Sequence, residues 1–262
     1  NNNTDNYVAW QWKCNSGTTE TAVSESGNNP AHQRQTNTTA GFSIITSTGT
    51  GGAGTIQHGL GAVPHWIISK GRSNDGGWVV YHQNNTSAPE TDALNLSSDG
   101  ATVDAVAWFN DTAPTSSVFT VGTTNDINGD GRTYIHYVFT EIQGYSKFGG
   151  YTGNGNQDGT FVYTGFKPAW IMAKRTDAAK NWYIADSTRS PINVNKAFLV
   201  PNSSDAEDTS GDKTDSYFDI LSNGFKLRQD FSHLNASGAE HIYMAFAEHP
   251  FASSKGVPVT AR

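Results

Sequence analysis

The feature that most constrains this chain is a ten-residue pattern that occurs twice. Residues 61–70 read GAVPHWIISK and residues 165–174 read GFKPAWIMAK, so both contain G-x-x-P-x-W-I-x-x-K at a separation of 104 residues. Trp78 and Trp182 continue the match at the same separation. Self-similarity at a fixed separation is the signature of a repeated structural unit. We therefore expect two units of one fold in tandem.

The correspondence extends to the ends of both units. GYS at residues 144–146 matches GFS at residues 41–43, and residues 242–248 match residues 135–141 at a separation of 107. Because the separation grows so little, insertions are expected only in loops. The sequence predicts one unit over residues 41–143, a second over residues 144–251, and a C-terminal tail over residues 252–262.

Short apolar runs separated by tight turns predict the fold class. Residues 66–70 and 78–81 flank Asn74-Asp-Gly-Gly77, which is typical of a hairpin turn. No segment keeps a helical periodicity over more than ~10 residues. Units of roughly a hundred residues with many short strands have the size of antiparallel sandwiches. In residues 66–70, Ile67 and Ser69 should face the inside of the sandwich, opposite Trp66, Ile68 and Lys70.

The first forty residues differ from the rest. They are polar apart from residues 7–12, YVAWQW, which align with residues 134–139 and resemble the last strand of a preceding unit. Residues 14–40 lack apolar periodicity and are expected to form a loop or an extended linker. We predict an all-β chain of two tandem antiparallel β-sandwich repeats, with an N-terminal linker (residues 1–40) that carries one extra strand. We also expect the chain to be the C-terminal part of a longer modular protein.

The charge balance bears on the partners. The chain has 17 Lys and Arg against 24 Asp and Glu, a net charge of −7. Nucleic acids and anionic membranes prefer a basic face, so neither is expected as a partner. No apolar run reaches the ~18 residues of a membrane-spanning helix, so membrane insertion is not expected. The single cysteine, Cys14, excludes an intrachain disulfide and is interpreted as an ordinary thiol.

Tryptophans are the first candidates for ligand binding, because an aromatic ring can stack on the apolar face of a sugar. Trp66 and Trp170 recur at equivalent strand positions, as do Trp78 and Trp182, and this recurrence favours a role in the core for both pairs. Trp108 has no tryptophan counterpart in the other unit, and Trp10 and Trp12 align only with other aromatic residues. We therefore expect Trp108, Trp10 and Trp12 to serve a ligand or an interface.

One loop resembles a metal site. Asp126, Asn128 and Asp130 lie in DINGDG, which matches the opening D-x-N-x-D-G of a calcium loop. The twelfth position, which should carry a bidentate acid, is Tyr137, and the second unit reads HLNASG at residues 233–238. Two interpretations stay open: calcium bound by the three residues, or a glycine-rich hairpin turn. No other cofactor is expected.

The sequence offers little for catalysis. It contains no G-x-S-x-G motif, no phosphate-binding loop and no Cys/His set with metal-ligand spacing. A glycosidase needs two carboxylates about 5–10 Å apart, and Glu141 and Glu248 occupy equivalent strand ends of different units. Such a repeated position favours a structural role, so we expect a protein that is not an enzyme.

The quoted motifs also resemble a known family. Residues 41–73, GYSKFG with the following YTGNG, FVYTGF at residues 161–166 and the closing AFAEHPF with GVPVTAR resemble repeat-bearing proteins of marine tailed bacteriophages, including those of cyanobacteria. The resemblance covers nearly all of residues 40–262. It implies a tail-fibre or virion-appendage module without assigned catalytic residues, located in the virion and assembled in the reducing cytoplasm of a bacterial host.

These observations give one leading hypothesis and two alternatives. We expect a non-enzymatic structural and adhesion module of a tail fibre that contacts a bacterial surface glycan or protein receptor, together with other virion proteins. A capsid-decorating or purely structural virion protein is the second hypothesis. The third is a glycan-degrading enzyme with acids from both units. Since fibres of this kind are usually trimers, we expect a homotrimer.

Overall fold

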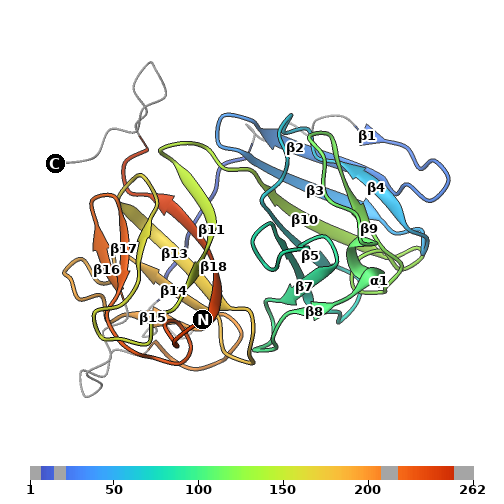
Figure 1. Ribbon diagram of the computed structural model, residues 1–262. Helices are drawn as coiled ribbons and strands as arrows, with labels where there is room; N and C mark the ends of the chain where they lie inside the picture. Colours follow the sequence, from blue (N-terminus) through green and yellow to red (C-terminus); the bar gives the residue numbers. More distant parts are fainter. Residues whose placement is uncertain (1–6, 15–21, 208–217, 251–262) are drawn as a thin grey trace.

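The protein is almost entirely β-structure, as expected (Figure 1). The computed structural model describes residues 7–14, 22–207 and 218–250. Within these residues the one α-helix is the single turn α1 (Val106–Phe109). No helix of the described part is long and apolar enough to cross a membrane. All strand pairs are antiparallel, so the predicted all-β class is confirmed.

The N-terminal half contains one large and one small sheet. The large sheet has eight strands in the order β1-β2-β3-β10-β5-β6-β7-β8. Its strands are β1 (Ala22–Val23), β2 (Ala31–Asn37), β3 (Phe42–Thr48), β5 (Trp66–Gly71), β6 (Trp78–His82), β7 (Asp92–Asn95), β8 (Val103–Asp104) and β10 (Thr133–Phe139). The small sheet pairs β4 (Gly54–Gln57) with β9 (Val118–Val121).

The C-terminal half also contains two sheets. Its larger sheet has the order β11-β18-β13-β14-β15, and its smaller sheet has the order β12-β17-β16. The larger sheet consists of β11 (Ser146–Thr152), β13 (Pro168–Arg175), β14 (Tyr183–Asp186), β15 (Phe198–Leu199) and β18 (Glu240–Ala247). The smaller sheet consists of β12 (Phe161–Tyr163), β16 (Phe218–Leu221) and β17 (Gly224–Leu227).

The two halves share a strand order. The central strands β3-β10-β5-β6-β7 of the first sheet correspond in chain order to β11-β18-β13-β14-β15 of the second. Trp66 lies opposite Phe139 on β10, and Trp170 lies opposite Phe246 on β18. The repeated tryptophan motif therefore occupies the same place in both sheets. The proposed division into repeats at residues 41–143 and 144–251 stays a prediction, and the expected tail at residues 252–262 lies outside the described residues.

The N-terminal region differs from the expectation. Residues 7–12 form no strand, and the expected linker contains β1 and β2, which extend the first large sheet. The strand β2 was not predicted from the sequence because its buried positions carry polar residues. His32 donates from Nδ1 to the Pro30 carbonyl, and the Thr36 hydroxyl donates to the His58 carbonyl. Hydrogen bonds satisfy these side chains, so the strand needs no apolar alternation.

Three apolar cores separate four layers of sheet. One core lies between the eight-stranded sheet and β4–β9 and includes Ile67, while another lies between the five- and three-stranded sheets and includes Ile171. These two isoleucines face inward as the alternation predicts. The third core lies between the two large sheets and contains Trp66, Trp170 and Trp182. The face expected to be half covered is thus buried against the other half of the molecule.

Hydrogen bonds also join the two halves. The Trp182 indole donates to the Asn95 carbonyl at 3.0 Å, and the Gln83 side-chain amide donates to the Phe148 carbonyl at 3.1 Å. The backbone amide of Thr102 donates to the Thr176 carbonyl at 2.8 Å. The central core therefore has polar contacts around it that fix how the two large sheets meet.

The central core generates a stability prediction. Replacing Trp170 with Ala should lower the free energy of unfolding by about 3–5 kcal/mol, because it empties a large buried aromatic site. Urea unfolding monitored by circular dichroism measures the change. Val103→Ala on the exposed strand β8 is the control and should change stability by less than about 0.5 kcal/mol. A loss no larger than that of the control would contradict the assignment of Trp170 to the core.

A buried histidine makes stability depend on pH. His136 lies between the Ser47 and Ser69 hydroxyls, at 2.9 Å and 2.8 Å from its two ring nitrogens, and burial lowers its pKa to about 3. The unfolded chain protonates near pH 6.5, so it binds more protons than the folded chain between these two pH values. Stability should therefore fall as pH drops through this window.

His136→Gln tests this dependence. The variant should be less stable near pH 7, and its unfolding free energy should change with pH less steeply, by about 1.4 kcal/mol per pH unit between pH 4 and 6. Urea unfolding at a series of pH values gives both slopes. Equal slopes for variant and wild type would show that His136 is not held neutral in the fold.

Candidate functional site

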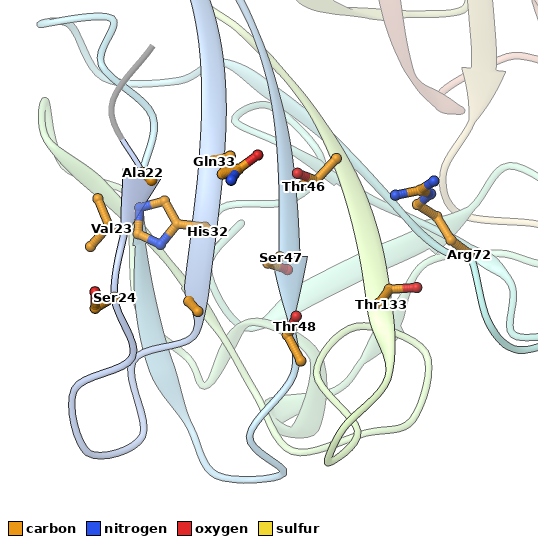
Figure 2. Close-up of a pocket in the computed structure, with 11 residues that line it drawn as sticks. Ala22, Val23, Ser24, His32, Gln33, Thr46, Ser47, Thr48, Arg72 and Thr133 are labelled. Atoms are coloured by element: carbon orange, nitrogen blue, oxygen red, sulfur yellow. The ribbon is translucent and has the colours of Figure 1, made fainter. Parts of the chain in front are cut away.

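The eight-stranded sheet leaves part of its outer face uncovered. Figure 2 shows a shallow pocket there, with a volume of about 370 Å³, on β1, β2, β3 and β10. Gln33 lies opposite Thr46 across β2 and β3, and Thr48 lies opposite Thr133 across β3 and β10. We call this pocket the polar trough, and its lining residues are Ala22, Val23, Ser24, Ala31, His32, Gln33, Thr46, Ser47, Thr48, Arg72 and Thr133.

An aromatic groove continues the same face towards the second half. Its volume is also about 370 Å³. The half-buried rings of Trp78 and Tyr137 stack with centroids 6.4 Å apart and an interplanar angle of 14°. The aromatic groove is lined by Trp10, Trp12, Phe42, Ile44, Ile68, Trp78, Leu96, Tyr137, Phe139, Trp170, Met172, Ile184, Pro201 and Met244.

The register of the sheet joins the groove to the trough. Ile44 lies opposite Tyr137, and Thr46 lies opposite Ile135, on adjacent positions of one face of β3 and β10. Residues two apart on a strand are about 7 Å apart and point the same way. The aromatic groove and the polar trough therefore form one surface, which we call the outer-face site.

The side chains of this site determine its chemistry. Of the residues that line the trough and the groove, none is Asp or Glu, and Arg72 is the one permanent charge. Hydrolysis of a glycoside needs two carboxylates. Aromatic faces, hydroxyls, an amide and a guanidinium instead provide stacking surfaces and hydrogen bonds. The outer-face site therefore combines stacking surfaces with hydrogen-bonding groups, which are the features that suit a polyhydroxylated ligand.

His32, the histidine of the trough, is committed to the fold. Its Nδ1 donates to the Pro30 carbonyl at 2.8 Å, and its Nε2 accepts from the Gln57 amide at 3.2 Å. Burial lowers the pKa of His32 below its usual value. Both ring nitrogens are used and the neutral ring is favoured, so His32 is not placed to transfer protons.

Comparison with known proteins gives a family. Residues 1–250 match the model of a domain of unknown function, DUF7483. The chain belongs to the DUF7483 family. No curated protein and no solved structure matches it. The function of this DUF7483 chain must therefore be inferred from the geometry of its own residues.

The structure brings together two of the three predicted aromatic residues of the DUF7483 chain. Trp10 and Trp12 both line the aromatic groove and both pack edge-on against Trp170, with ring centroids 6.1 Å and 5.4 Å apart. The Arg189 guanidinium lies 5.6 Å from the centre of the Trp10 ring, a cation–π contact. The two tryptophans therefore shape the groove while they hold residues 7–14 against the second half.

Trp108 lies elsewhere, and two groove residues escaped the sequence analysis. Trp108 is on α1 and packs against the core of the first half. Trp78 was grouped with the core because it matches Trp182, which is fully buried, whereas Trp78 is only half buried. Tyr137 was noticed only as a mismatch to a calcium loop. Tyr137 is two residues before Phe139 on β10, so the two side chains share one face of the strand. This alternation in the sequence could have predicted that Tyr137 lies in the groove.

In the loop that resembles a calcium site, the side chain of Asn128 is the centre of a hydrogen-bond network. The buried Asn128 side chain donates from Nδ2 to the carbonyls of Gly52, at 2.7 Å, and Gly122, at 2.9 Å. Its Oδ1 accepts from the Thr50 amide at 3.1 Å. The middle residue of the motif thus ties three loop segments together, which favours the interpretation as a turn.

Asn235, the matching residue of the second half, has the same role. Its Oδ1 accepts from the Asn154 amide at 3.0 Å, and its Nδ2 donates to the Gln229 carbonyl at 2.7 Å. Asp126 and Asp130 have no such counterparts. In the described part of the chain, no group of three or more His, Cys, Asp and Glu residues has the geometry to hold a metal ion.

If the loop is a structural turn, loss of the Asn128 side chain should destabilise the protein, whereas a calcium site would depend on Asp130. Asn128→Ala should lower the unfolding free energy by about 2–4 kcal/mol, because the buried Gly122 carbonyl and the partly buried Gly52 carbonyl lose their donor. Asp130→Ala, at an exposed position of the same loop, should change it by less than about 0.5 kcal/mol. Thermal unfolding in EDTA and in millimolar calcium chloride measures both. A calcium-dependent rise in melting temperature that Asp130→Ala abolishes would instead support metal binding.

Proposed function

We propose that this chain is a non-enzymatic adhesion module that binds a glycan through the outer-face site. The observation that carries the proposal is the continuity of the aromatic groove, at the edge of the central core, with the polar trough on the same face of the eight-stranded sheet. A sugar ring has an apolar C–H face and a rim of hydroxyls. The site offers aromatic and polar side chains side by side, which matches both features.

Each part of the site has a role in the proposal. The half-buried ring of Trp78 provides a face on which a sugar ring stacks. Thr46 and Gln33, opposite each other on β3 and β2, donate and accept hydrogen bonds to hydroxyls. Arg72 adds a planar fork of donors that suits vicinal oxygens. The absence of lining carboxylates supports binding over hydrolysis.

We further propose that the module acts in a bacteriophage tail fibre or appendage, where its ligand is a bacterial surface glycan. The resemblance of its repeated motifs to virion-appendage proteins supports this setting. The second candidate is a capsid-decorating or purely structural protein that contacts only other virion proteins. The internal packing of Trp10 and Trp12 against Trp170 favours that candidate. Immunogold labelling of virions separates tail from head.

Variants of the outer-face site test the glycan proposal. Trp78→Ala and Arg72→Ala should each weaken adhesion of the purified protein to host cells by about tenfold, the effect of about 1.4 kcal/mol of lost binding energy. Gln57→Ala, on the opposite side of the sandwich, is the control. Fluorescent protein bound to cells is measured against concentration. Unchanged adhesion in both site variants, or release of reducing sugars by the wild type, would contradict the proposal.

The assembly state is a separate part of the proposal. We propose a homotrimer, because appendages of this kind use threefold symmetry and closed symmetric contacts are the common solution for repeated subunits. Static light scattering at micromolar concentration should give three times the monomer mass of 28.2 kDa. A monomer mass under these conditions would reject the trimer without bearing on glycan binding.

A further inference from the structure

The outermost sheet of the second half exposes two aromatic rings on one strand. Phe161 is 45% exposed and Tyr163 is 63% exposed, while Val162 between them is buried in the core. Both rings point away from the core because they alternate with Val162 on β12. Neighbouring exposed aromatic residues on one face of a sheet are candidates for a contact surface.

The first half shows that the fold does not require these rings. Its strand β4 occupies the corresponding place, since Ile56 is buried opposite Phe119 as Val162 is buried opposite Phe225. The residues flanking Ile56 are Thr55 and Gln57. The two positions that flank the buried residue are therefore polar in the first half and aromatic in the second. Packing accounts for the buried residues, and the exposed rings call for a partner.

The neighbouring strand β17 carries a buried glycine beside the rings. Gly224 lies opposite Tyr163, and Lys226 lies opposite Phe161. A Cβ atom at Gly224 would be 2.1 Å from the Val162 carbonyl oxygen and 3.1 Å from the Phe161 ring, so no larger residue fits without a shift. The Phe161 ring therefore packs beside the buried backbone of Gly224, and this residue adds no side chain next to the two rings. We call Phe161, Tyr163 and Gly224 the aromatic platform.

The charges around the platform cancel. Lys226 forms an ion pair with Asp158, and Arg228 lies 3.3 Å from the Asp219 carboxylate. Each cation has an acidic partner, so the surface carries no net charge from these four residues. It presents charged donors and acceptors beside apolar rings. Such a surface is complementary to a neutral ligand with hydroxyl groups and has little attraction for a polyanion.

We propose that the aromatic platform is a second glycan-contact site, which takes a neutral sugar chain. The inference rests on the proposed function and adds a second site and a ligand class to it. The rings of Phe161 and Tyr163 are attached about 7 Å apart along β12, so each can stack against a different part of an extended sugar chain. Lys226 and Asp219, in one row across the sheet, hydrogen-bond its hydroxyls.

Exchange of the platform for the residues of the first half is the test. Phe161→Thr combined with Tyr163→Gln installs the polar pair that the fold accepts at β4, and Val63→Thr, at another exposed apolar residue, is the control. Affinity electrophoresis in gels that contain dextran, mannan or laminarin measures Kd. Dextran sulfate provides an anionic partner with the dextran backbone. We expect the double variant to raise Kd for a neutral polysaccharide about tenfold, and the control to leave it unchanged.

The outcomes separate this inference from the proposed function. If Arg72→Ala and Trp78→Ala weaken binding but the double variant does not, the platform is overturned and the outer-face site stands. If wild-type protein binds none of the neutral polysaccharides, the platform as a site for neutral sugar chains is overturned, and the outer-face site is judged by the adhesion of its own variants to cells. Stronger binding to dextran sulfate than to dextran would overturn the neutral ligand. A concentration-dependent mass in light scattering that the double variant alone loses would show that the platform is an interface between copies.

Discussion

The burial of both faces of each large sheet is the constraint on which the rest of the structure depends. Trp66, Trp170 and Trp182 fill the core between these sheets, while Ile67 and Ile171 face separate cores on the opposite sides. Strands buried on both faces lose the polar alternation of a half-exposed sheet, which explains why GAVPHWIISK and GFKPAWIMAK are apolar at consecutive positions. The repeated motif is thus the sequence signature of a strand between two cores.

The outer-face site follows from a mismatch in width between the two large sheets. The first has eight strands and the second has five, and β1 and β2 extend the first sheet beyond β3. Apolar residues such as Phe42 and Phe139 lie where the second half covers the sheet, and Thr46, Thr48 and Gln33 lie beyond it. The boundary between covered and uncovered surface therefore coincides with the transition from aromatic groove to polar trough. A ligand there would contact both kinds of side chain.

The sequence predicted the strands that carry the repeat and the inward direction of Ile67 and Ile171, because local periodicity determines both. It did not predict β2, whose buried His32 and Thr36 are satisfied by hydrogen bonds. It also could not reveal the central core, since alternation shows that a face is apolar but not what covers it. The groove was predicted only through Trp10 and Trp12. Trp78 was missed because its match to the buried Trp182 concealed its half-buried position.

The two halves share one strand order, so equivalent positions can be compared. Such a comparison distinguishes residues that the fold requires from residues that are available for function. Asn128 and Asn235 make equivalent hydrogen bonds in equivalent loops, so their shared identity is explained by the fold. The aspartates beside Asn128 are not shared, and the loop forms in the second half without them. Gln57 and Tyr163 show the opposite case, because one exposed strand position carries unlike residues in the two halves. A difference that packing does not require is where a partner can act.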